Sequence, residues 1–167
     1  MNENNFPMTQ RELYRQGWRS LKRKEDGTKS VSAAADPLDG LRVLVVEDEA
    51  LVAMLIEEYL LELGCKIACS ANRIAKAMKG LQTSSVDVAV LDVNVAGENI
   101  SGLAETLDRR GIPFVFASGY GARGVDPRWR RHPVLQKPFT GTDLRAALLA
   151  SLENKNGARL SSARQSP

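Results

Sequence analysis

Apolar residues along the middle of the chain alternate between two regular patterns. Short continuous runs rich in Val, Ile and Leu are typical of strands buried on both faces, and apolar residues at helical spacing are typical of amphipathic helices. The continuous runs predict strands at residues 41–48, 66–70, 86–93, 112–118 and 134–136. The helical spacing predicts helices at residues 51–63, 73–81, 101–111 and 142–154.

Residues at the ends of these segments support the helices. Gly64 and Gly111 each end a helical pattern, a position where glycine is common, and Thr142 is the expected N-cap of the last helix. Strands that alternate with helices in this way indicate an α/β fold of the (βα)5 type, with a parallel sheet covered by helices on both faces.

The alternation has one weak point, at residues 121–132, where a fourth helix is expected. Two glycines, Pro127, and only Val125 and Trp129 as large apolar residues leave this segment without a convincing buried face. We therefore predict a loop or a short, mobile helix there.

The segments that flank the alternation are polar. Residues 1–40 contain few large apolar residues and predict a poorly ordered N-terminal arm, and residues 154–167 predict a disordered basic tail. The domain itself is predicted at residues 41–153.

Within the N-terminal arm, three apolar residues fall at helical spacing. Tyr14, Trp18 and Leu21 would form one stripe on a basic helix. Such a helix either docks against a partner or another part of the domain, or frays in solvent.

Length and charge narrow the class of protein. The chain of 167 residues has room for one domain, and no output domain fits after residue 153. Its net charge of +3 comes from the flanking segments, so it gives no ground for nucleic-acid binding. The apolar runs are too short for a membrane span, and the N-terminus lacks the apolar core of a signal peptide. We expect a soluble, cytoplasmic protein without a membrane partner.

Cysteine and histidine are too rare for most metal sites. Cys65 and Cys69 do not have the spacing of a CxxC motif, and packing is a better explanation for them than a redox pair. With His132 as the only histidine, a zinc or iron site would lack ligands, whereas a hard cation held by carboxylates remains possible.

Polar residues gather where the predicted strands end. In a parallel sheet these ends lie at one edge, where ligands bind. The residues at this edge are Glu47, Asp48, Glu49, Asp92, Ser118, Gly119 and Lys137. Each alone has an ordinary explanation as a turn, cap or surface residue, but together they converge on one crevice.

The chemistry of this crevice points to phosphoryl transfer. Carboxylates that crowd together repel one another unless a cation lies between them, and an oxygen-only ligand set with open positions favours Mg²⁺. A carboxylate can itself attack phosphorus and become an acyl phosphate. Lysine, serine and backbone N–H groups would then supply positive charge and position around the phosphoryl oxygens.

The segments VLVVEDE, LDVN, FASGYG and LQKPF stand in the order and context found in the receiver domains of bacterial two-component response regulators. The resemblance covers residues 41–153. It implies a flavodoxin-like, doubly wound five-stranded sheet of order 2-1-3-4-5. It further implies Asp92 as the phosphoacceptor and Mg²⁺ held by Glu47, Asp48, Asp92 and the carbonyl of Asn94. In the family, the residues matching Ser118 and Lys137 contact the phosphoryl group, and the peptide matching Lys137–Pro138 is cis.

The segment PFVFASGYG is similar to the standalone "FAT GUY" branch, with Ser118 where that motif has Thr. This likeness implies a single-domain regulator phosphorylated by a sensor histidine kinase, with a downstream protein or phosphotransferase as a possible second partner. Neither a DNA-binding domain nor enzymatic activity beyond gain and loss of the phosphoryl group is expected. Val134 stands where many receivers have Tyr or Phe, so we expect the signal to leave through the loop after Ser118, with Gly119, Tyr120 and Trp129 as its switch region.

Two other functions fit parts of the pattern. One is an interaction adaptor that keeps the fold without being phosphorylated, against which the complete set of site residues counts. The other is a phosphohydrolase like the haloacid dehalogenases, which would need a second acid where this chain has Asn94.

Overall fold

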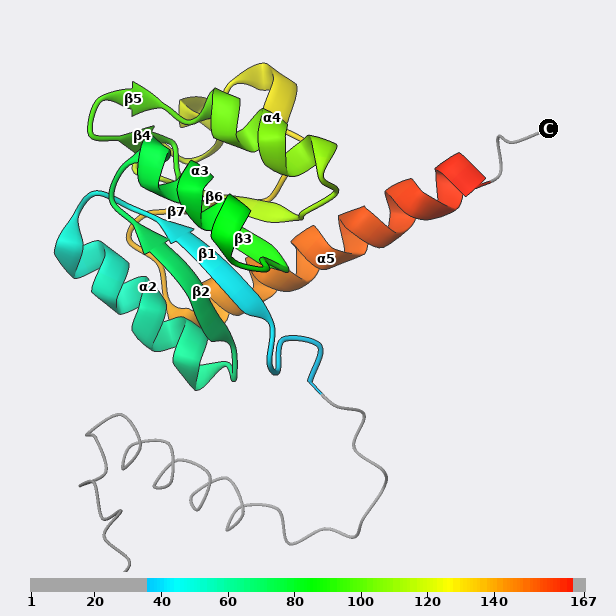
Figure 1. Ribbon diagram of the computed structural model, residues 1–167, viewed down its shortest axis with the longest axis horizontal. Coiled ribbons are helices and arrows are strands. Elements are labelled where there is room, and N and C mark those ends of the chain that lie inside the picture. Colours follow the sequence, from blue (N-terminus) through cyan, green and yellow to red (C-terminus); the bar gives the residue numbers. More distant parts are fainter. Residues whose placement is uncertain (1–35, 164–167) are drawn as a thin grey trace, which may run out of the picture. The chain divides into compact units, whose positions relative to one another are not determined.

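A five-stranded parallel sheet forms the centre of the part of the chain that the structure describes, residues 36–163 (Figure 1). The structure is a computed structural model, and it describes side chains up to residue 154. The strands are β1 (Arg42–Val46), β2 (Lys66–Ala71), β3 (Val88–Asp92), β6 (Phe114–Ser118) and β7 (Val134–Gln136), in the spatial order β2-β1-β3-β6-β7. The predicted α/β class and the order 2-1-3-4-5 are therefore confirmed.

Helices cover both faces of this sheet. They are α2 (Ala50–Glu62), α3 (Ile74–Thr83), α4 (Ser101–Arg109) and α5 (Gly141–Ala163). Alternate residues of β1 enter different cores: Val43 and Val45 pack with residues of α2 and α5, whereas Leu44 and Val46 pack with residues of α3 and α4. Because side chains alternate along a strand, a strand covered on both faces is apolar at nearly every position. This explains the continuous apolar runs in the sequence.

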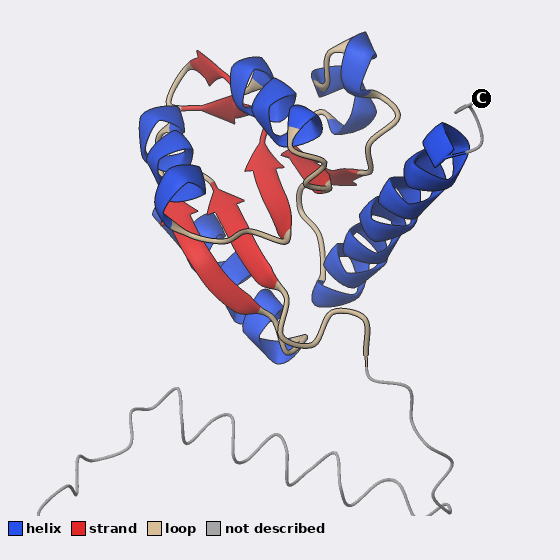
Figure 2. Ribbon diagram, turned by 45° about the vertical axis from the view of Figure 1, so that its right-hand side comes forward, coloured by secondary structure: helices blue, strands red, loops and turns tan. Residues whose placement is uncertain are grey.

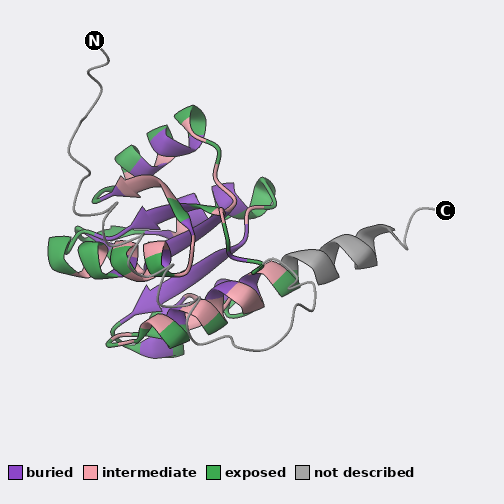
Figure 3. Cartoon of the chain, turned by 90° about the horizontal axis from the view of Figure 1, so that it is seen from below, coloured by how far each residue is buried: buried purple, intermediate pink, exposed green. Residues whose placement is uncertain are grey.

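The parallel strands bring their carboxyl ends to one edge of the sheet. Figure 2 shows the red arrowheads pointing toward this edge, where a small two-stranded hairpin also lies. The central strands β1, β3 and β6 are almost wholly buried, whereas the edge strands β2 and β7 are only partly buried (Figure 3). Within residues 36–163, no helix combines the length and apolar character that crossing a bilayer requires.

The domain begins earlier than the predicted boundary after residue 40. The compact unit that contains the sheet starts at Asp36, and Leu38 is fully buried against α2 and α5. The Asp36 carboxylate accepts the N–H of Leu38 at 3.0 Å and pairs with Arg145 at 3.0 Å. One apolar residue within a polar segment gives no periodic pattern, so the sequence signal for this turn is weak. The rest of the predicted arm, with Tyr14, Trp18 and Leu21, lies outside the described residues.

Helix α5 also differs from its prediction at both ends. It continues to Ala163, so residues 154–163 are helical and not a disordered tail. Extending a helix costs little once its first turns are anchored, as Leu144 and Leu148 anchor these. The N-cap is Thr140 and not Thr142, because the Thr140 hydroxyl accepts the N–H of Asp143 while the Asp143 carboxylate accepts the N–H of Thr140.

The predicted weak point is a pair of short 3-10 turns, η1 (Gly121–Gly124) and η2 (Pro127–Trp129). The absence of a regular fourth helix is as predicted. The expected lack of a buried face is wrong, because Val125 and Trp129 are both buried in the core beside α3 and α4. The Trp129 and Phe114 rings meet edge to face at 6.1 Å. Two anchors four residues apart are too few to produce a helical pattern in the sequence.

One element was not predicted at all, the hairpin of β4 (Asn94–Val95) and β5 (Glu98–Asn99). Its two-residue turn places Ala96 at φ 53° and Gly97 at φ 80°. Two residues with positive φ make the turn that best matches the twist of a hairpin. Strands of two residues are too short for alternation, so Gly97 is the only sequence signal of this turn.

Candidate functional site

Four strands deliver the predicted site residues to the carboxyl edge of the sheet. Glu47 and Asp48 directly follow β1, Asp92 ends β3, Ser118 ends β6 and Lys137 directly follows β7. The sheet neighbours β1, β3, β6 and β7 run parallel, so these ends lie side by side. The convergence expected from the sequence is present in the structure.

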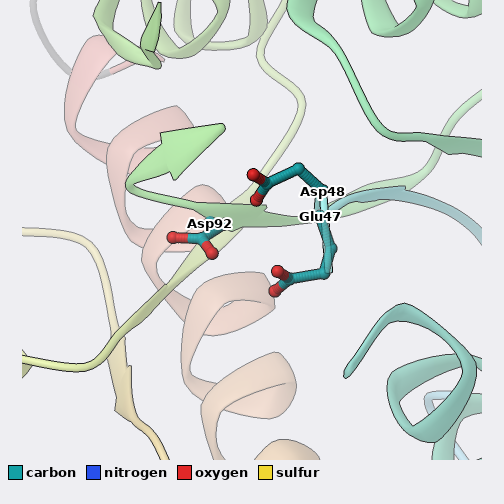
Figure 4. A group of neighbouring side chains, drawn as sticks. All are labelled: Glu47, Asp48 and Asp92. Carbon is teal, nitrogen blue, oxygen red and sulfur yellow. The ribbon is translucent and has the colours of Figure 1, made fainter. Parts of the chain in front are cut away.

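Three of these side chains form a cluster of carboxylates. Glu47, Asp48 and Asp92 each offer an oxygen atom, and these atoms lie within 4.8 Å of one another. Figure 4 shows the three side chains pointing toward a common centre from the ends of two strands. Glu47 and Asp92 are buried, whereas Asp48 is exposed to solvent. The cluster therefore opens to solvent on the side of Asp48.

Lys137 neutralises the buried part of this cluster. Its Nζ donates to Glu47 Oε2 at 2.6 Å and to Asp92 Oδ2 at 2.7 Å. The following peptide, Lys137–Pro138, is cis, as the family resemblance implies. Charge-assisted hydrogen bonds of this length are the strong kind, so the ammonium group holds both carboxylates in place.

The protonation of the cluster follows from burial and from this pairing. Burial raises the pKa of Glu47 to about 7, more than the hydrogen bond from Lys137 lowers it. Burial alone would lower the pKa of Lys137, but the hydrogen bonds to Asp92 and Glu47 outweigh burial, so this pKa lies above its usual value. Lys137 is therefore charged at neutral pH.

Backbone N–H groups bind one further oxygen of each carboxylate. Asn94 donates its N–H to Asp92 Oδ1 at 3.1 Å, and Glu49 donates its N–H to Glu47 Oε1 at 3.3 Å. The N–H of Ala96, in the turn of the hairpin, donates to Asp48 Oδ2 at 2.9 Å. Sequence reasoning missed Ala96, because a backbone donor leaves no trace in the identity of its side chain.

Ser118 is fully buried and is held by the loop that follows it. Its Oγ accepts the N–H of Tyr120 at 3.1 Å, and its carbonyl accepts the N–H of Lys137 at 2.9 Å. The second contact ties the end of β6 to the residue that carries the ammonium group. A displacement of Ser118 would therefore reach both Lys137 and the loop.

The three predicted switch residues lie in different surroundings. Tyr120 is 79% exposed and Gly119 is also exposed, whereas Trp129 is only 6% exposed and belongs to the core. Val134, which stands where many receivers have an aromatic residue, is half-buried at the start of β7. Trp129 therefore anchors the loop to the core, and Tyr120 is an aromatic side chain that the loop presents to solvent.

The donor set suits a hard cation. It consists only of oxygen atoms, and Mg²⁺ is commonly held by one or two carboxylates with water and phosphate oxygens in its other positions. Asp48 is exposed and adjacent to the buried pair, which leaves such open positions toward solvent. Asp92 could then attack phosphorus while the ammonium group and the cation face the developing charge.

The fold and the site together define an α/β domain of flavodoxin-like topology, with a lysine-paired carboxylate cluster at the carboxyl edge of its sheet. The chain belongs to the response regulator receiver domain family, whose match spans residues 43–149.

Individual regulators and solved structures are also similar to this chain. It is 30% identical over 118 residues to the transcriptional regulatory protein PdtaR of Mycobacterium tuberculosis (strain ATCC 25618 / H37Rv), a match that covers 68% of this chain and 58% of PdtaR. The solution structure of SdrG from Sphingomonas melonis Fr1 is 42% identical, with a TM-score of 0.63 over 68% of this chain and 97% of SdrG. The BeF3-activated conformation of SdrG from Pseudomonas melonis Fr1 is 43% identical, with a TM-score of 0.58 over 65% of this chain and 93% of that one.

Proposed function

We propose that this protein is a single-domain response regulator in which Asp92 accepts a phosphoryl group from a sensor histidine kinase. The observation that carries the proposal is the pairing of Asp92 with Lys137 at 2.7 Å inside a cluster of three carboxylates. Such a cluster, in a family of receiver domains, gives Asp92 both a charged partner and neighbours able to hold a cation. The proposed signal is a change of surface, without turnover of a separate metabolite.

The transfer step forms one bond and breaks another. A carboxylate oxygen of Asp92 attacks the phosphorus of a phosphohistidine, the P–N bond breaks, and the imidazole of the donor leaves with its electron pair. Asp92 Oδ1 accepts the N–H of Asn94 and Oδ2 accepts from Lys137, so the carboxylate is held in a fixed orientation before the donor arrives. Fixed orientation of the reacting oxygen is a large part of what a protein contributes to phosphoryl transfer.

Glu47, Asp48, Asp92 and the carbonyl of Asn94 are the proposed ligands of Mg²⁺. When bound, Mg²⁺ supplies positive charge beside the transferring phosphoryl oxygens. In the phosphorylated protein, Ser118 and Lys137 are the proposed contacts of the phosphoryl group. The short distance between Lys137 and Asp92 supports this role for Lys137, and the position of Ser118 at the end of the next strand supports it for the hydroxyl.

A protein is the proposed phosphodonor because helix α2 carries an exposed apolar stripe beside the site. Leu51, Met54 and Leu55, in the first two turns after the acidic pair, are 82%, 65% and 39% exposed. Exposed apolar patches of this kind commonly mark surfaces that dock other proteins. A donor that packs on this stripe would bring its phosphohistidine toward Asp92.

The exit for the signal is proposed to be the loop of Gly119 and Tyr120, with Trp129 as its anchor in the core. The match to nearly the whole of SdrG supports a receiver that acts alone, with a downstream protein or phosphotransferase as partner. Nothing in the proposed function requires a DNA-binding domain or a membrane partner.

Phosphorylation by a small phosphodonor tests the proposal. The purified protein is incubated with acetyl phosphate and Mg²⁺, and its intact mass is measured. We expect an acid-labile increase of one phosphoryl group that requires Mg²⁺ and is lost in Asp92→Asn. Asp108→Asn is the matched control, because Asp108 is an exposed carboxylate of α4 paired with Arg131 at 2.7 Å.

Two outcomes would overturn the proposal. An unchanged mass under all conditions would favour the adaptor without phosphorylation, and a mass increase that persists in Asp92→Asn would place the phosphoryl group elsewhere.

A further inference from the structure

Ser118 and Gly124 approach each other more closely than a side chain at residue 124 would allow. A Cβ atom built on Gly124 would lie 2.4 Å from Ser118 Oγ and 3.4 Å from Tyr120 Cβ. Carbon and oxygen atoms that are not bonded do not approach to 2.4 Å, so the serine hydroxyl occupies space that every other residue at 124 would fill. The two residues are brought together because η1 folds the chain back over the end of β6.

Residue 124 must be glycine because there is no room for a side chain, and not because of its backbone conformation. Its φ does not lie in the left-handed region, whereas Gly121, in the same turn, has a φ of 57°. Gly119 provides the contrast, because it also lacks a left-handed φ and a Cβ there would meet no atom within 4 Å. Of these three loop glycines, Gly124 is thus the one whose missing side chain determines where the Ser118 hydroxyl lies.

The hydroxyl in this space is engaged by the loop. Ser118 is fully buried, so its Oγ must have a hydrogen-bond partner, and in this structure the partner is the N–H of Tyr120. A serine side chain has three staggered positions. In the phosphorylated protein, the proposed contact of Ser118 with the phosphoryl group would require another of these positions, away from Tyr120.

We propose that Gly124 is a positioning residue that sets the equilibrium of the Ser118 hydroxyl between the loop and the phosphoryl site. This inference rests on the proposed function, because it assumes that Asp92 carries a phosphoryl group. By leaving space for the hydroxyl beside Tyr120, Gly124 stabilises the unphosphorylated arrangement. A methyl group at residue 124 removes that space and displaces the hydroxyl from the loop.

The proposal predicts the sign of the effect on a phosphoryl mimic. If the resting position of Ser118 is destabilised, less free energy is needed to reach the position that contacts the mimic, and the mimic binds more tightly. We expect Gly124→Ala to bind beryllofluoride, in the presence of Mg²⁺, about tenfold more tightly than wild type, since an added methyl in a packed site costs about this much. The matched control Gly102→Ala, in α4, should bind it as wild type does, because a Cβ there would also meet no atom within 4 Å.

A double-mutant cycle separates this contact from general disturbance of the loop. In Ser118→Ala the hydroxyl is absent, so adding Gly124→Ala to it should leave beryllofluoride affinity unchanged. Affinity is measured by titration followed through amide resonances, with the full-length protein and Mg²⁺ throughout. If Gly124→Ala changed beryllofluoride affinity equally in the wild-type and Ser118→Ala backgrounds, the proposal would be overturned. It would also be overturned if Gly124→Ala had no effect on this affinity in either background.

The hydrogen bond to Tyr120 gives a second measurement that does not depend on the folding of any variant. In wild type, beryllofluoride should remove the acceptor of the Tyr120 N–H, so hydrogen exchange of this amide should become faster. Retained protection of the Tyr120 amide in the complex would overturn the proposal. If wild type does not bind beryllofluoride at all, the proposed function fails instead, so the two failures are distinguishable.

Discussion

The charge balance of the site depends on the side chain of Lys137. It is 18% exposed and joins two carboxylates, of which Glu47 is wholly buried. A buried carboxylate that loses its cationic partner is strongly destabilising unless another cation replaces it. The lysine therefore has a structural role as well as the proposed contact with the phosphoryl group.

Replacing this lysine should destabilise the fold in a way that Mg²⁺ partly reverses. Lys137→Ala should lower the free energy of unfolding by about 1–3 kcal/mol, since the pair is partly open to solvent. Urea unfolding at neutral pH without Mg²⁺ measures the loss of stability, and the same experiment with Mg²⁺ measures how much of it is recovered. Lys66→Ala, an exposed lysine of β2, is the control and should change little. Equal stability of Lys137→Ala and wild type without Mg²⁺ would contradict this account.

His132 is a second residue whose surroundings affect stability, through the pKa of its side chain. Its ring stacks on Phe114 with centroids 3.9 Å apart. Burial lowers the pKa of His132, the charge of Arg131 lowers it further, and Asp108 raises it in part. The unfolded chain therefore takes up the histidine proton at a higher pH than the folded protein does.

This difference predicts the sign of a pH effect on stability. As pH falls below about 6.5, the unfolded state binds a proton that the folded state does not, so His132 makes the protein less stable. Glu47 has the opposite tendency in a similar pH range, because its pKa is raised to about 7. Comparing the pH dependence of urea unfolding in wild type and His132→Gln isolates the histidine. The wild type should lose more stability on acidification than the variant, and parallel curves would contradict the assignment.

The charged side chains that meet at the carboxyl edge of the sheet could be predicted, whereas the contacts of Ala96 and Gly124 could not. Glu47, Asp92 and Lys137 were predicted because the ends of parallel strands meet at one edge. Ala96 and Gly124 act through an N–H group and through the absence of a side chain, and neither property follows from residue type without the fold.

At the scale of elements, the start of α5 shows how a local signal was assigned to the wrong residue. Thr140 and Asp143 cap the helix reciprocally, with Thr140 Oγ1 also donating to Asp143 Oδ2 at 2.7 Å. Thr142 is the next threonine and lies inside the first turn. Two threonines separated by one residue fit the sequence pattern almost equally well.

The cap predicts a difference between these two threonines. Thr140→Ala should lower the free energy of unfolding by about 1 kcal/mol, the usual cost of losing a capping side chain. Thr142→Ala, in the same turn, should change it by less than about 0.5 kcal/mol, as is usual for a surface substitution. Urea unfolding of both variants measures the difference. Stability lost in Thr142→Ala and not in Thr140→Ala would mean that the helix begins at the later residue.

Long elements were predicted better than short ones for a physical reason. Strands such as β1 and helices such as α2 bury several residues at a fixed period, and that period is visible in the sequence. The hairpin of β4 and β5 and the turns η1 and η2 bury only one or two apolar residues each, such as Val95 in the hairpin and Trp129, which packs against Phe114. Because so few buried residues produce no period, the sequence showed these elements weakly or not at all.

At the scale of the whole molecule, the short elements flank the predicted site. The hairpin holds Asp48 through Ala96, and η1 lies over Ser118 through Gly124. The sheet and helices α2 to α5 form a stable frame, and the segments held by few contacts lie where the proposed phosphoryl group would act. Segments of low local stability are the ones that one new contact can shift.

The central claim is that Asp92, and no other carboxylate of the cluster, carries the phosphoryl group. The most direct test is to phosphorylate the protein with acetyl phosphate and Mg²⁺, reduce the acyl phosphate with borohydride, and map the modified residue by peptide mass spectrometry. Borohydride converts an aspartyl phosphate to homoserine, which survives digestion and marks the residue that carried the phosphoryl group. This account predicts homoserine at residue 92 and unmodified residues at 47 and 48. Homoserine at residue 48, or a modification outside the cluster, would contradict it.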